Sequence, residues 1–411
     1  MLNRIKVQGF KSLADVELEL PRLTVLFGPN AAGKSNLLDA IQALSRMGTC
    51  RTLADALSEP IRGYPIEAFS FAAGGLVELL SAASAQLSLE AEFTREEDAY
   101  RYRVSVEITP ESGTLSVVDE YLAVLGRDGQ PRGTAAIELM EGKLRVRRKR
   151  ESGKPRYESL RQNYALLSDP RLGKPFYPAI EGARAELSDW RLYYLDPRVA
   201  MRSARAPAEV RDIGVLGEDI APFLYRLRGE NPKHFEAVKR TLRSLIPSVE
   251  DLTVDLDKRR GTLDILLRQG GTDFSSRIIS EGTLRVLALC SIAVNPWSGS
   301  LLAFEEPENG VHPRRLELIV QLLVSLAMEQ ERQLIVTTHS PLFCDAMLKQ
   351  GQSRLGEIAL VRVSGALNQT EVRPFDVTGP LFKDAEIAKA LTAESENGLF
   401  ESLLLRGMLD E

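Results

Sequence analysis

The sequence contains little of the residues that carry disulfide and metal chemistry. Of its 411 residues only three are cysteine and three are histidine. The cysteines Cys50, Cys290 and Cys344 lie far apart, and none belongs to a CxxC pair or to a Cys/His cluster with zinc-like spacing. We therefore expect reduced thiols in the cytoplasm, with neither a disulfide framework nor a zinc site.

Long apolar runs are also missing. No stretch of about 18 uncharged apolar residues occurs, and charges stand within the first eleven positions, where a signal peptide needs an apolar core. No segment sustains the apolar a and d positions of a long coiled coil. These absences predict a protein that neither spans a membrane nor carries a signal peptide or long coiled-coil arms.

The residues that are present describe an ordinary folded protein. Hydrophobic residues make up 44% of the chain and charged residues 27%, which is typical of globular domains. The formal net charge of -5 provides no global attraction to nucleic acid, so any contact with DNA or RNA needs a local basic patch. The densest basic run comprises Lys143, Arg145, Arg147, Arg148, Lys149, Arg150, Lys154 and Arg156.

The order of apolar patterns predicts an α/β head that is interrupted by insertions. We expect its N-terminal half over residues 1–84, an inserted β-rich lobe over 85–200, a helical region over 201–250, its C-terminal half over 251–345 and an extension over 346–411. The lobe is inferred from strand-like stretches over 87–93, 100–108, 114–124 and 136–146. The two ends of the chain should join in one sheet, and the extension should hold a strand over 358–363 and a helix near 385–391.

A glycine-rich loop gives the strongest chemical signal. A short apolar strand over residues 23–27 leads into GPNAAGKS, and helical spacing follows from residue 35. The loop amides and the helix N-terminus can surround phosphate oxygens, Lys34 can neutralise their charge and Ser35 can bind Mg²⁺. The predicted nucleotide-binding residues are Gly28, Pro29, Asn30, Ala31, Ala32, Gly33, Lys34, Ser35 and the following Asn36.

A second signal is an apolar strand that ends in two carboxylates. Residues 301–304 are apolar and are followed by Glu305 and Glu306, whose side chains diverge if they continue a strand. Glu305 is then suited to the Mg²⁺ side of the site, and Glu306 to orienting or deprotonating the attacking water. The plainer interpretation is that these acids only solubilise the end of a strand.

A third signal is TTHSP, which also follows an apolar strand. The imidazole of His339 in this motif can contact a terminal phosphate and respond to its loss, although a histidine at a strand end is often structural. We predict Lys34, Glu306 and His339 as the catalytic residues, with ATP and Mg²⁺ as cofactors.

Taken in order, GPNAAGKS, SEGTLR, FEEPENGVHP and TTHSP resemble the ATP-binding-cassette superfamily, in the branch of RecF-like and overcoming-lysogenization-defect-like AAA ATPases. The resemblance covers the two end regions, about half the chain. It implies a P-loop NTPase head with a mixed sheet, carrying the β-rich lobe and a short helical region as additions. After His339 the sequence lacks the cluster of acidic residues that a Toprim nuclease domain would have.

The resemblance also implies roles for residues outside the loop. Ser280 and Gly282 would close over the nucleotide held by a second copy, because a hydroxyl and a glycine at a helix start present donors to an anion. Asn309, Gly310 and His312 would form the loop where two copies touch, although His312 is equally well read as an exposed turn residue. Lys11 and Ser12 resemble a segment that approaches the nucleotide.

The sequence departs from the family pattern in two ways. Glu305 stands where many members have aspartate, and the glutamine that usually links the nucleotide to the accessory lobe is not assignable.

Three functions remain open. The first is an ATPase that works as a head-to-tail homodimer in DNA repair or antiphage defence, with DNA contact possible through the basic run. The second is an ATP-dependent regulatory scaffold for a separately encoded nuclease or toxin. The third, a transporter cassette, is the least favoured because such cassettes are shorter and carry LSGGQ.

Overall fold

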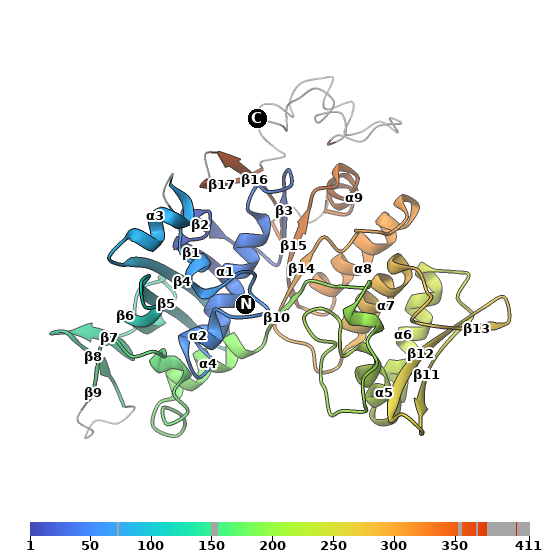
Figure 1. Ribbon diagram of the computed structural model, residues 1–411, viewed down its shortest axis with the longest axis horizontal. Helices are drawn as coiled ribbons and strands as arrows, with labels where there is room; N and C mark the ends of the chain where they lie inside the picture. Colours follow the sequence, from blue (N-terminus) through green and yellow to red (C-terminus); the bar gives the residue numbers. More distant parts are fainter. Residues whose placement is uncertain (72–73, 149–154, 352–355, 367–368, 376–399, 401–411) are drawn as a thin grey trace. The chain divides into compact units, whose positions relative to one another are not determined.

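The computed structural model describes residues 1–71, 74–148, 155–351, 356–366, 369–375 and 400 (Figure 1). The helix predicted over 385–391 lies outside these residues. The chain divides into two compact units. Unit 1 comprises Met1–Pro21, Gly28–Trp190 and Val361–Pro374, and unit 2 comprises Arg22–Phe27, Arg191–Leu360 and Phe375–Glu411.

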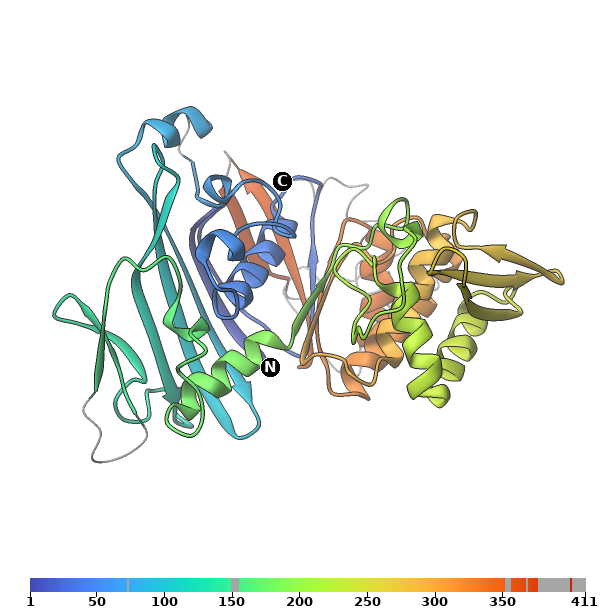
Figure 2. The ribbon, with the colours of Figure 1, turned by 60° about the horizontal axis from the view of Figure 1, so that its bottom comes forward.

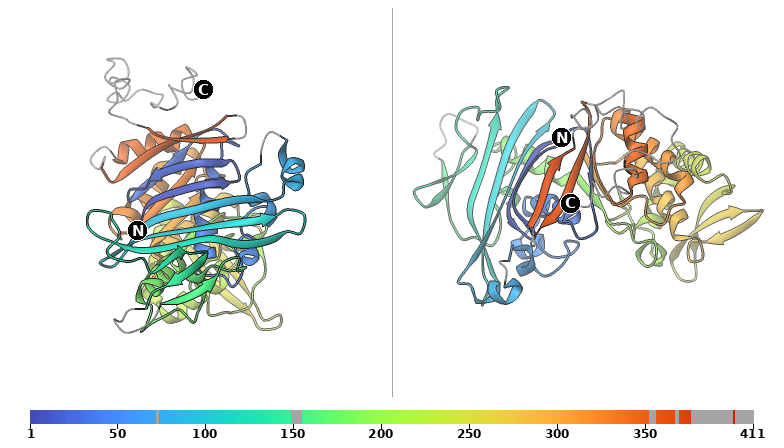
Figure 3. Two further views of the ribbon diagram at one scale, coloured as in Figure 1. Left: turned by 90° about the vertical axis from the view of Figure 1, so that its left-hand side faces the viewer. Right: turned by 90° about the horizontal axis from the view of Figure 1, so that it is seen from above.

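Unit 1 is built on an eight-stranded antiparallel sheet. Its strand order is β2-β1-β4-β5-β6-β7-β8-β9. The longest strands alternate buried and half-exposed residues, as a sheet with one covered face requires. The strands are β1 (Leu2–Phe10), β2 (Leu13–Glu19), β4 (Ala85–Arg95), β5 (Asp98–Thr109), β6 (Thr114–Leu125), β7 (Ile137–Met140), β8 (Lys143–Val146) and β9 (Arg156–Ser159), and Figure 3 shows them side by side.

The two longest helices of unit 1 contact this sheet (Figure 2), and the short helix α2 (Leu53–Ala56) contacts β6. The helix α1 (Lys34–Met47) follows the glycine-rich loop, and α4 (Pro178–Ser188) begins at a proline that fits the first helical turn. Shorter pieces complete the unit: η1 (Pro65–Ala68), α3 (Gly75–Ser81) and η2 (Leu166–Ser168).

The single strand predicted over 136–146 is wrong. The segment forms two strands, β7 and β8, that pair with each other in a hairpin. Glu141 and Gly142 make the turn with φ of 48° and 75°. Two consecutive residues with positive φ are the mark of a two-residue hairpin turn whose twist matches that of the strands.

Unit 2 contains the parallel core strands β3 (Leu23–Phe27), β14 (Leu301–Glu305) and β15 (Gln333–Thr338). They belong to a six-stranded sheet of order β10-β14-β15-β3-β16-β17, in which β10 spans Trp190–Tyr193, β16 spans Ile358–Ala366 and β17 spans Gln369–Pro374. Every residue of β3 and β15 is buried, as expected for parallel strands. The prediction that strands from the two ends of the chain share a sheet is confirmed.

The helices of unit 2 supply its core. The helix α7 (Glu281–Val294) is apolar over most of its length and buries eleven of its residues. The remaining elements are η3 (Ala200–Arg202), α5 (Ile220–Glu230), α6 (Pro232–Leu245), η4 (Pro313–Arg315), α8 (Leu316–Met328), α9 (Pro341–Gly351) and the three-stranded sheet β11 (Asp251–Asp257), β12 (Thr262–Gln269) and β13 (Thr272–Ser275). Among the described residues, no helix is long and apolar enough to cross a membrane.

Candidate functional site

The glycine-rich loop wraps around the ammonium group of Lys34. The Nζ atom donates to the carbonyl oxygens of Gly28 and Pro29, each at 2.8 Å, and the side chain is only 5% exposed. Gly33 caps α1 with φ of 101°, a conformation that favours glycine. The loop therefore holds a positive charge beside a helix N-terminus, which is the arrangement that binds phosphate groups.

The glycines at the two ends of the loop are required by a close neighbour. The strands β16 and β17 form a hairpin, whose residues from Val361 onward belong to unit 1. A Cβ atom on Gly28 would lie 2.0 Å from the carbonyl oxygen of Val363, and one on Gly33 would lie 1.9 Å from Oγ1 of Thr370. The β16–β17 hairpin therefore packs so closely against the loop that a side chain at either glycine would clash with it.

Ser12 and Asn36 join the loop to this hairpin by hydrogen bonds. Oγ of Ser12 lies 2.6 Å from Oγ1 of Thr370 and accepts from Nδ2 of Asn36 at 2.7 Å. Oγ1 of Thr370 also lies within hydrogen-bond distance of the carbonyl oxygen of Ala32, at 3.1 Å. Thr370 was not predicted from the sequence, because it lies 338 residues after Ala32 of the loop, in a strand without a recognisable motif.

Lys11 makes contacts within unit 1 that restrict its ammonium group. Its Nζ atom lies 2.6 Å from Oδ2 of Asp39 and donates to the carbonyl oxygen of Arg62 at 2.9 Å. Asp39 is fully buried on α1 and also accepts from the Arg62 guanidinium at 3.1 Å. The structure therefore joins Lys11 to the helix that follows the phosphate loop.

In unit 2 the three parallel strands end level with one another. Glu305 pairs with Thr337 in register, and Thr338 pairs with Phe27. The carboxyl ends of neighbouring parallel strands are where open α/β sheets bind ligands. Glu305 therefore ends β14 at the same edge of the sheet where β3 ends at Phe27.

Glu306 is held in an unusual backbone conformation just past β14. Its φ is 44°, and its N–H donates to the carbonyl oxygen of Thr337 at 3.0 Å. Its Oε1 atom lies 2.9 Å from Nδ1 of His339. Positive φ at a non-glycine residue is costly and tends to occur at functional sites. The structure brings two predicted catalytic side chains, Glu306 and His339, into direct contact.

Two charged residues beside Glu306 had no predicted role. Burial raises the pKa of the Glu308 carboxyl, which accepts from Oγ1 of Thr338 at 2.5 Å. Burial lowers the pKa of the Arg285 guanidinium, and the charges of Glu308 and Glu306 act in the opposite direction. Arg285 donates to the carbonyl oxygens of Glu306 and Leu195, each at 3.3 Å. The sequence held a signal for the role of Arg285, because it is an arginine inside an otherwise apolar helix and a buried charge needs partners.

The helix start at Ser280 contacts the loop that follows Glu308. Oγ of Ser280 accepts from the N–H of Thr283 at 3.2 Å and so caps α7. A Cβ atom on Gly282 would lie 2.2 Å from the carbonyl oxygen of Gly310. Nδ1 of His312 accepts from the N–H of Arg314, which is a capping role in an exposed turn. The segments at 280–282 and 309–312 are therefore neighbours.

The two residues predicted to bind Mg²⁺ are Ser35 and Glu305. No group of three or more His, Cys, Asp or Glu residues that could hold a metal occurs in the described part of the chain. Mg²⁺ is usually held by one or two side-chain oxygens together with phosphate oxygens and water. Ser35 in unit 1 and Glu305 in unit 2 each carry an oxygen of this type.

The comparisons with known proteins agree with this fold. A family model described as "AAA domain, putative AbiEii toxin, Type IV TA system" matches residues 23–345. Over 49 residues the chain is 51% identical to the DNA replication and repair protein RecF of Anaeromyxobacter sp. (strain Fw109-5), a match that spans 12% of this chain and 13% of that protein.

Two solved structures have a similar fold. One is an Smc head bound to the C-winged helix domain of ScpA, with a TM-score of 0.53 and 16% identity over 92% of this chain and 98% of that one. The other is an Smc head with an extended coiled coil bound to the C-terminal domain of ScpA, derived from Pyrococcus furiosus, with a TM-score of 0.52 and 13% identity over 95% and 99%.

Proposed function

Because this chain belongs to the AAA-domain family and is an ATPase of the RecF-like and Smc-like, ATP-binding-cassette type, we propose that it works as a Mg²⁺-dependent head-to-tail homodimer. ATP binding closes the dimer and hydrolysis opens it. The observation that supports this chemistry is the register of the parallel strands β14, β15 and β3. Their last residues, Glu305, Thr338 and Phe27, lie at the same edge of the sheet.

In this proposal the loop amides and Lys34 hold the phosphates of ATP. Lys34 exchanges its two carbonyl partners for phosphate oxygens, which are stronger acceptors because they are charged. Ser35 and Glu305 hold the Mg²⁺ ion, which neutralises developing charge on the phosphates.

Glu306 orients the attacking water and accepts its proton. The contact at 2.9 Å with His339 fixes the direction of the carboxylate, and the strained backbone at Glu306 holds that carboxylate beyond the strand end. His339 contacts the terminal phosphate and responds to its departure. Ser280 and Gly282 of a second copy complete the site.

The Glu306→Gln variant tests this assignment. It keeps the side-chain shape and removes the base, so ATP binding should persist while the rate of hydrolysis falls by about 10²-fold or more. ATP should then accumulate a dimer that size-exclusion chromatography with light scattering detects. The matched control is Glu317→Gln, an exposed residue on α8. A Glu306→Gln chain that hydrolyses ATP at the normal rate would falsify the assignment.

The biological setting that we propose is DNA repair or antiphage defence in the cytoplasm. The short RecF match supports the first, since that relative is a DNA replication and repair protein. A second candidate is a regulatory ATPase whose nucleotide state controls a separately encoded nuclease or toxin, and the description of the matching family, which names a toxin and a type IV TA system, favours it. The regulatory candidate is supported if a neighbouring gene product co-purifies with the Glu306→Gln chain and does not co-purify with Lys34→Ala.

A further inference from the structure

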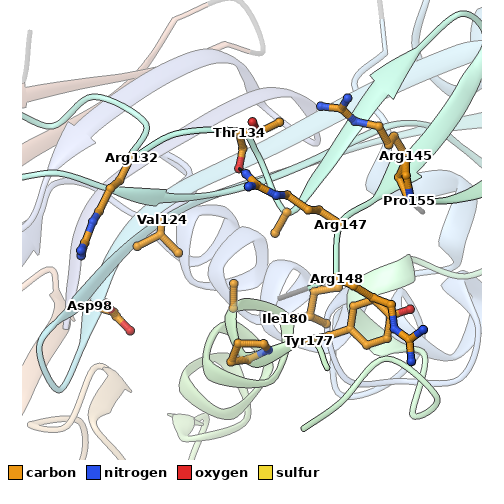
Figure 4. A pocket seen from close by; sticks show the side chains of 13 residues that line it. Asp98, Val124, Arg132, Thr134, Arg145, Arg147, Arg148, Pro155, Tyr177 and Ile180 are labelled. Carbon is orange, nitrogen blue, oxygen red and sulfur yellow. Dashed lines mark hydrogen bonds between the residues drawn. The ribbon is translucent and has the colours of Figure 1, made fainter. Parts of the chain in front are cut away.

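A cavity of about 720 Å³ in unit 1 has four arginines among the described residues that line it (Figure 4). They are Arg132 in the connection between β6 and β7, Arg145 on β8, and Arg147 and Arg148 just after β8. The opposite wall is the first turn of α4, including Ile180. A cavity of this size accommodates a ligand of one or two nucleotide units.

The positive charge of this cavity is only partly neutralised. Arg145 is ion-paired with Glu138, and Arg147 donates to the carbonyl oxygen of Thr134 at 3.2 Å, which is not an anion. The Arg132 side chain is exposed and has no hydrogen bond or ion pair within the described ranges. Among the described residues of the lining, Asp98 is the one that is acidic. Arg132, Arg147 and Arg148 therefore leave an excess of positive charge that an anionic ligand can neutralise.

The arginines do not converge on a single point. Figure 4 shows Arg132 and Arg145 on opposite sides of the cavity, Arg147 between them, and Arg148 lower down beside Tyr177, with guanidinium groups that point in different directions. A site for one phosphate ion gathers its donors around one position. Charges that are spread along a groove instead match the successive phosphates of a strand.

Two exposed aromatic rings lie next to arginines of the lining, although neither ring lines the cavity itself. Tyr157 pairs with Arg145 in the register of β8 and β9, so the two side chains share a face of the sheet, and Tyr157 is 52% exposed. The ring of Phe176 is 49% exposed and lies under the Arg148 guanidinium, with 4.2 Å from Cζ to the ring centroid. Aromatic rings beside a basic groove serve as stacking platforms for unpaired bases.

We propose that this cavity binds a segment of single-stranded nucleic acid. Arg132 and Arg147 contact its phosphates, and a base stacks on Tyr157. Unpaired bases are required because rings can stack only on exposed base faces, which favours a single strand over an intact duplex. The proposal does not depend on ATP hydrolysis by the head.

Fluorescence anisotropy with a labelled oligothymidylate of about 12 nucleotides tests the proposal, since such sites span about 4 to 16 nucleotides. The full chain is titrated without ATP over a range of salt concentrations. Arg132→Ala with Arg147→Ala should weaken binding by at least about tenfold and reduce the slope of log affinity against log salt by about 1.4, since each phosphate contact contributes about 0.7. The control pair is Arg51→Ala with Arg259→Ala, two exposed arginines outside the cavity.

Stacking is tested separately from charge. Tyr157→Ala should weaken binding by about tenfold and leave the salt slope unchanged, because a base contact releases no counterions. Tyr64→Ala is the control, since Tyr64 is 76% exposed in the same unit and, unlike Tyr157, is not paired with a residue of the lining. Repeating the titration with Lys34→Ala separates this site from the nucleotide loop, because that variant should bind the strand normally.

Three results overturn the proposal. The first is absence of strand binding by the unaltered chain, and the second is an arginine pair variant that binds as well as its control. The third is displacement of the oligonucleotide by thymidine monophosphate or pyrophosphate at equal phosphate concentration, which identifies a site for a single phosphate group. Loss of binding in Lys34→Ala would also count against a separate site, whereas loss of ATP hydrolysis alone would leave the proposal standing.

Discussion

At the scale of single residues, the hydroxyl group of Thr370 supports the phosphate loop from outside. It lies within hydrogen-bond distance of Ser12 and of the Ala32 carbonyl oxygen, and its side chain fills the space that a Cβ atom on Gly33 would need. Ser12 in turn accepts from Asn36 on α1. Thr370 of the β16–β17 hairpin therefore contacts the loop directly at Ala32 and the start of α1 through Ser12 and Asn36.

Replacing Thr370 by valine tests this support. Valine keeps the shape of threonine but leaves buried polar partners unsatisfied, which costs about 1–3 kcal/mol in loop stability. We expect the KM for ATP to rise several-fold while kcat changes less, because the variant removes no reacting group. Thr370→Ser retains the hydroxyl and should restore KM. Equal steady-state constants for Thr370→Val and the unaltered chain would show that the loop keeps its shape unaided.

At the scale of elements, one buried carboxylate ties η2 to the sheet. Glu120 on β6 is fully buried and accepts from the N–H groups of Leu166 and Leu167 at 2.6 and 2.8 Å and from the Tyr102 hydroxyl at 3.1 Å. Burial raises the pKa of Glu120 to about 7 despite these donors. The proton is therefore held more tightly in the folded chain than in the unfolded chain.

This shift predicts a stability that decreases as pH rises. A raised pKa means that the contribution of Glu120 is fully present below its unfolded pKa of about 4.5, is lost between there and about 7, and changes no further above that. The loss amounts to about 3 kcal/mol, at 1.36 kcal/mol for each pKa unit. Denaturant unfolding at several pH values between 4.5 and 8 measures it as the difference between the unaltered chain and Glu120→Gln, which does not titrate. Parallel stability curves for the two proteins would contradict the prediction.

Elements defined by local pattern were predictable from the sequence, whereas elements defined by distant contacts were not. The loop at Gly28 and the strand before Glu305 were predictable from residue type and spacing, and α5 and α6 lie within the region 201–250 that the apolar pattern marks as helical. The place of Thr370 beside Gly33 depends on a contact between the two ends of the chain, which no local pattern encodes. Glu120 looked like any polar residue of an alternating strand, because burial by η2 is a tertiary property.

The contact between Glu306 and His339 was partly predictable from the sequence. Each residue was predicted from the end of its own strand, and parallel pairing of β14 with β15 then brings those ends together. The positive φ of Glu306 was not predictable, since glutamate has no local preference for that conformation. Arg285 and Glu308 were missed as partners because their roles depend on how α7 packs near the end of β14.

At the scale of the whole molecule, the proposed dimer has two equivalent sites, each built from the loop of one copy and the Ser280 segment of the other. Ser280 is exposed in a single chain, as a residue that completes a partner's site must be. Head-to-tail pairing about a two-fold axis makes both sites identical. At any one site, the loop therefore comes from one copy of the chain and Ser280 from the other, so that substitutions in these two motifs act from different copies.

Mixing two inactive variants tests this arrangement. Lys34→Ala removes the phosphate contact, and Ser280→Arg places a bulky cation where the partner's nucleotide would be. In a mixed dimer one site carries both defects and the other carries neither. Random exchange makes about half of the dimers mixed, so ATP hydrolysis should recover to about a quarter of the rate of the unaltered chain. Retained ATP binding by Ser280→Arg alone, measured by isothermal titration, confirms that this variant is folded despite losing the cap of α7. Hydrolysis in the mixture no faster than the sum of the two separate variants would mean that the two motifs act within one copy or not at all.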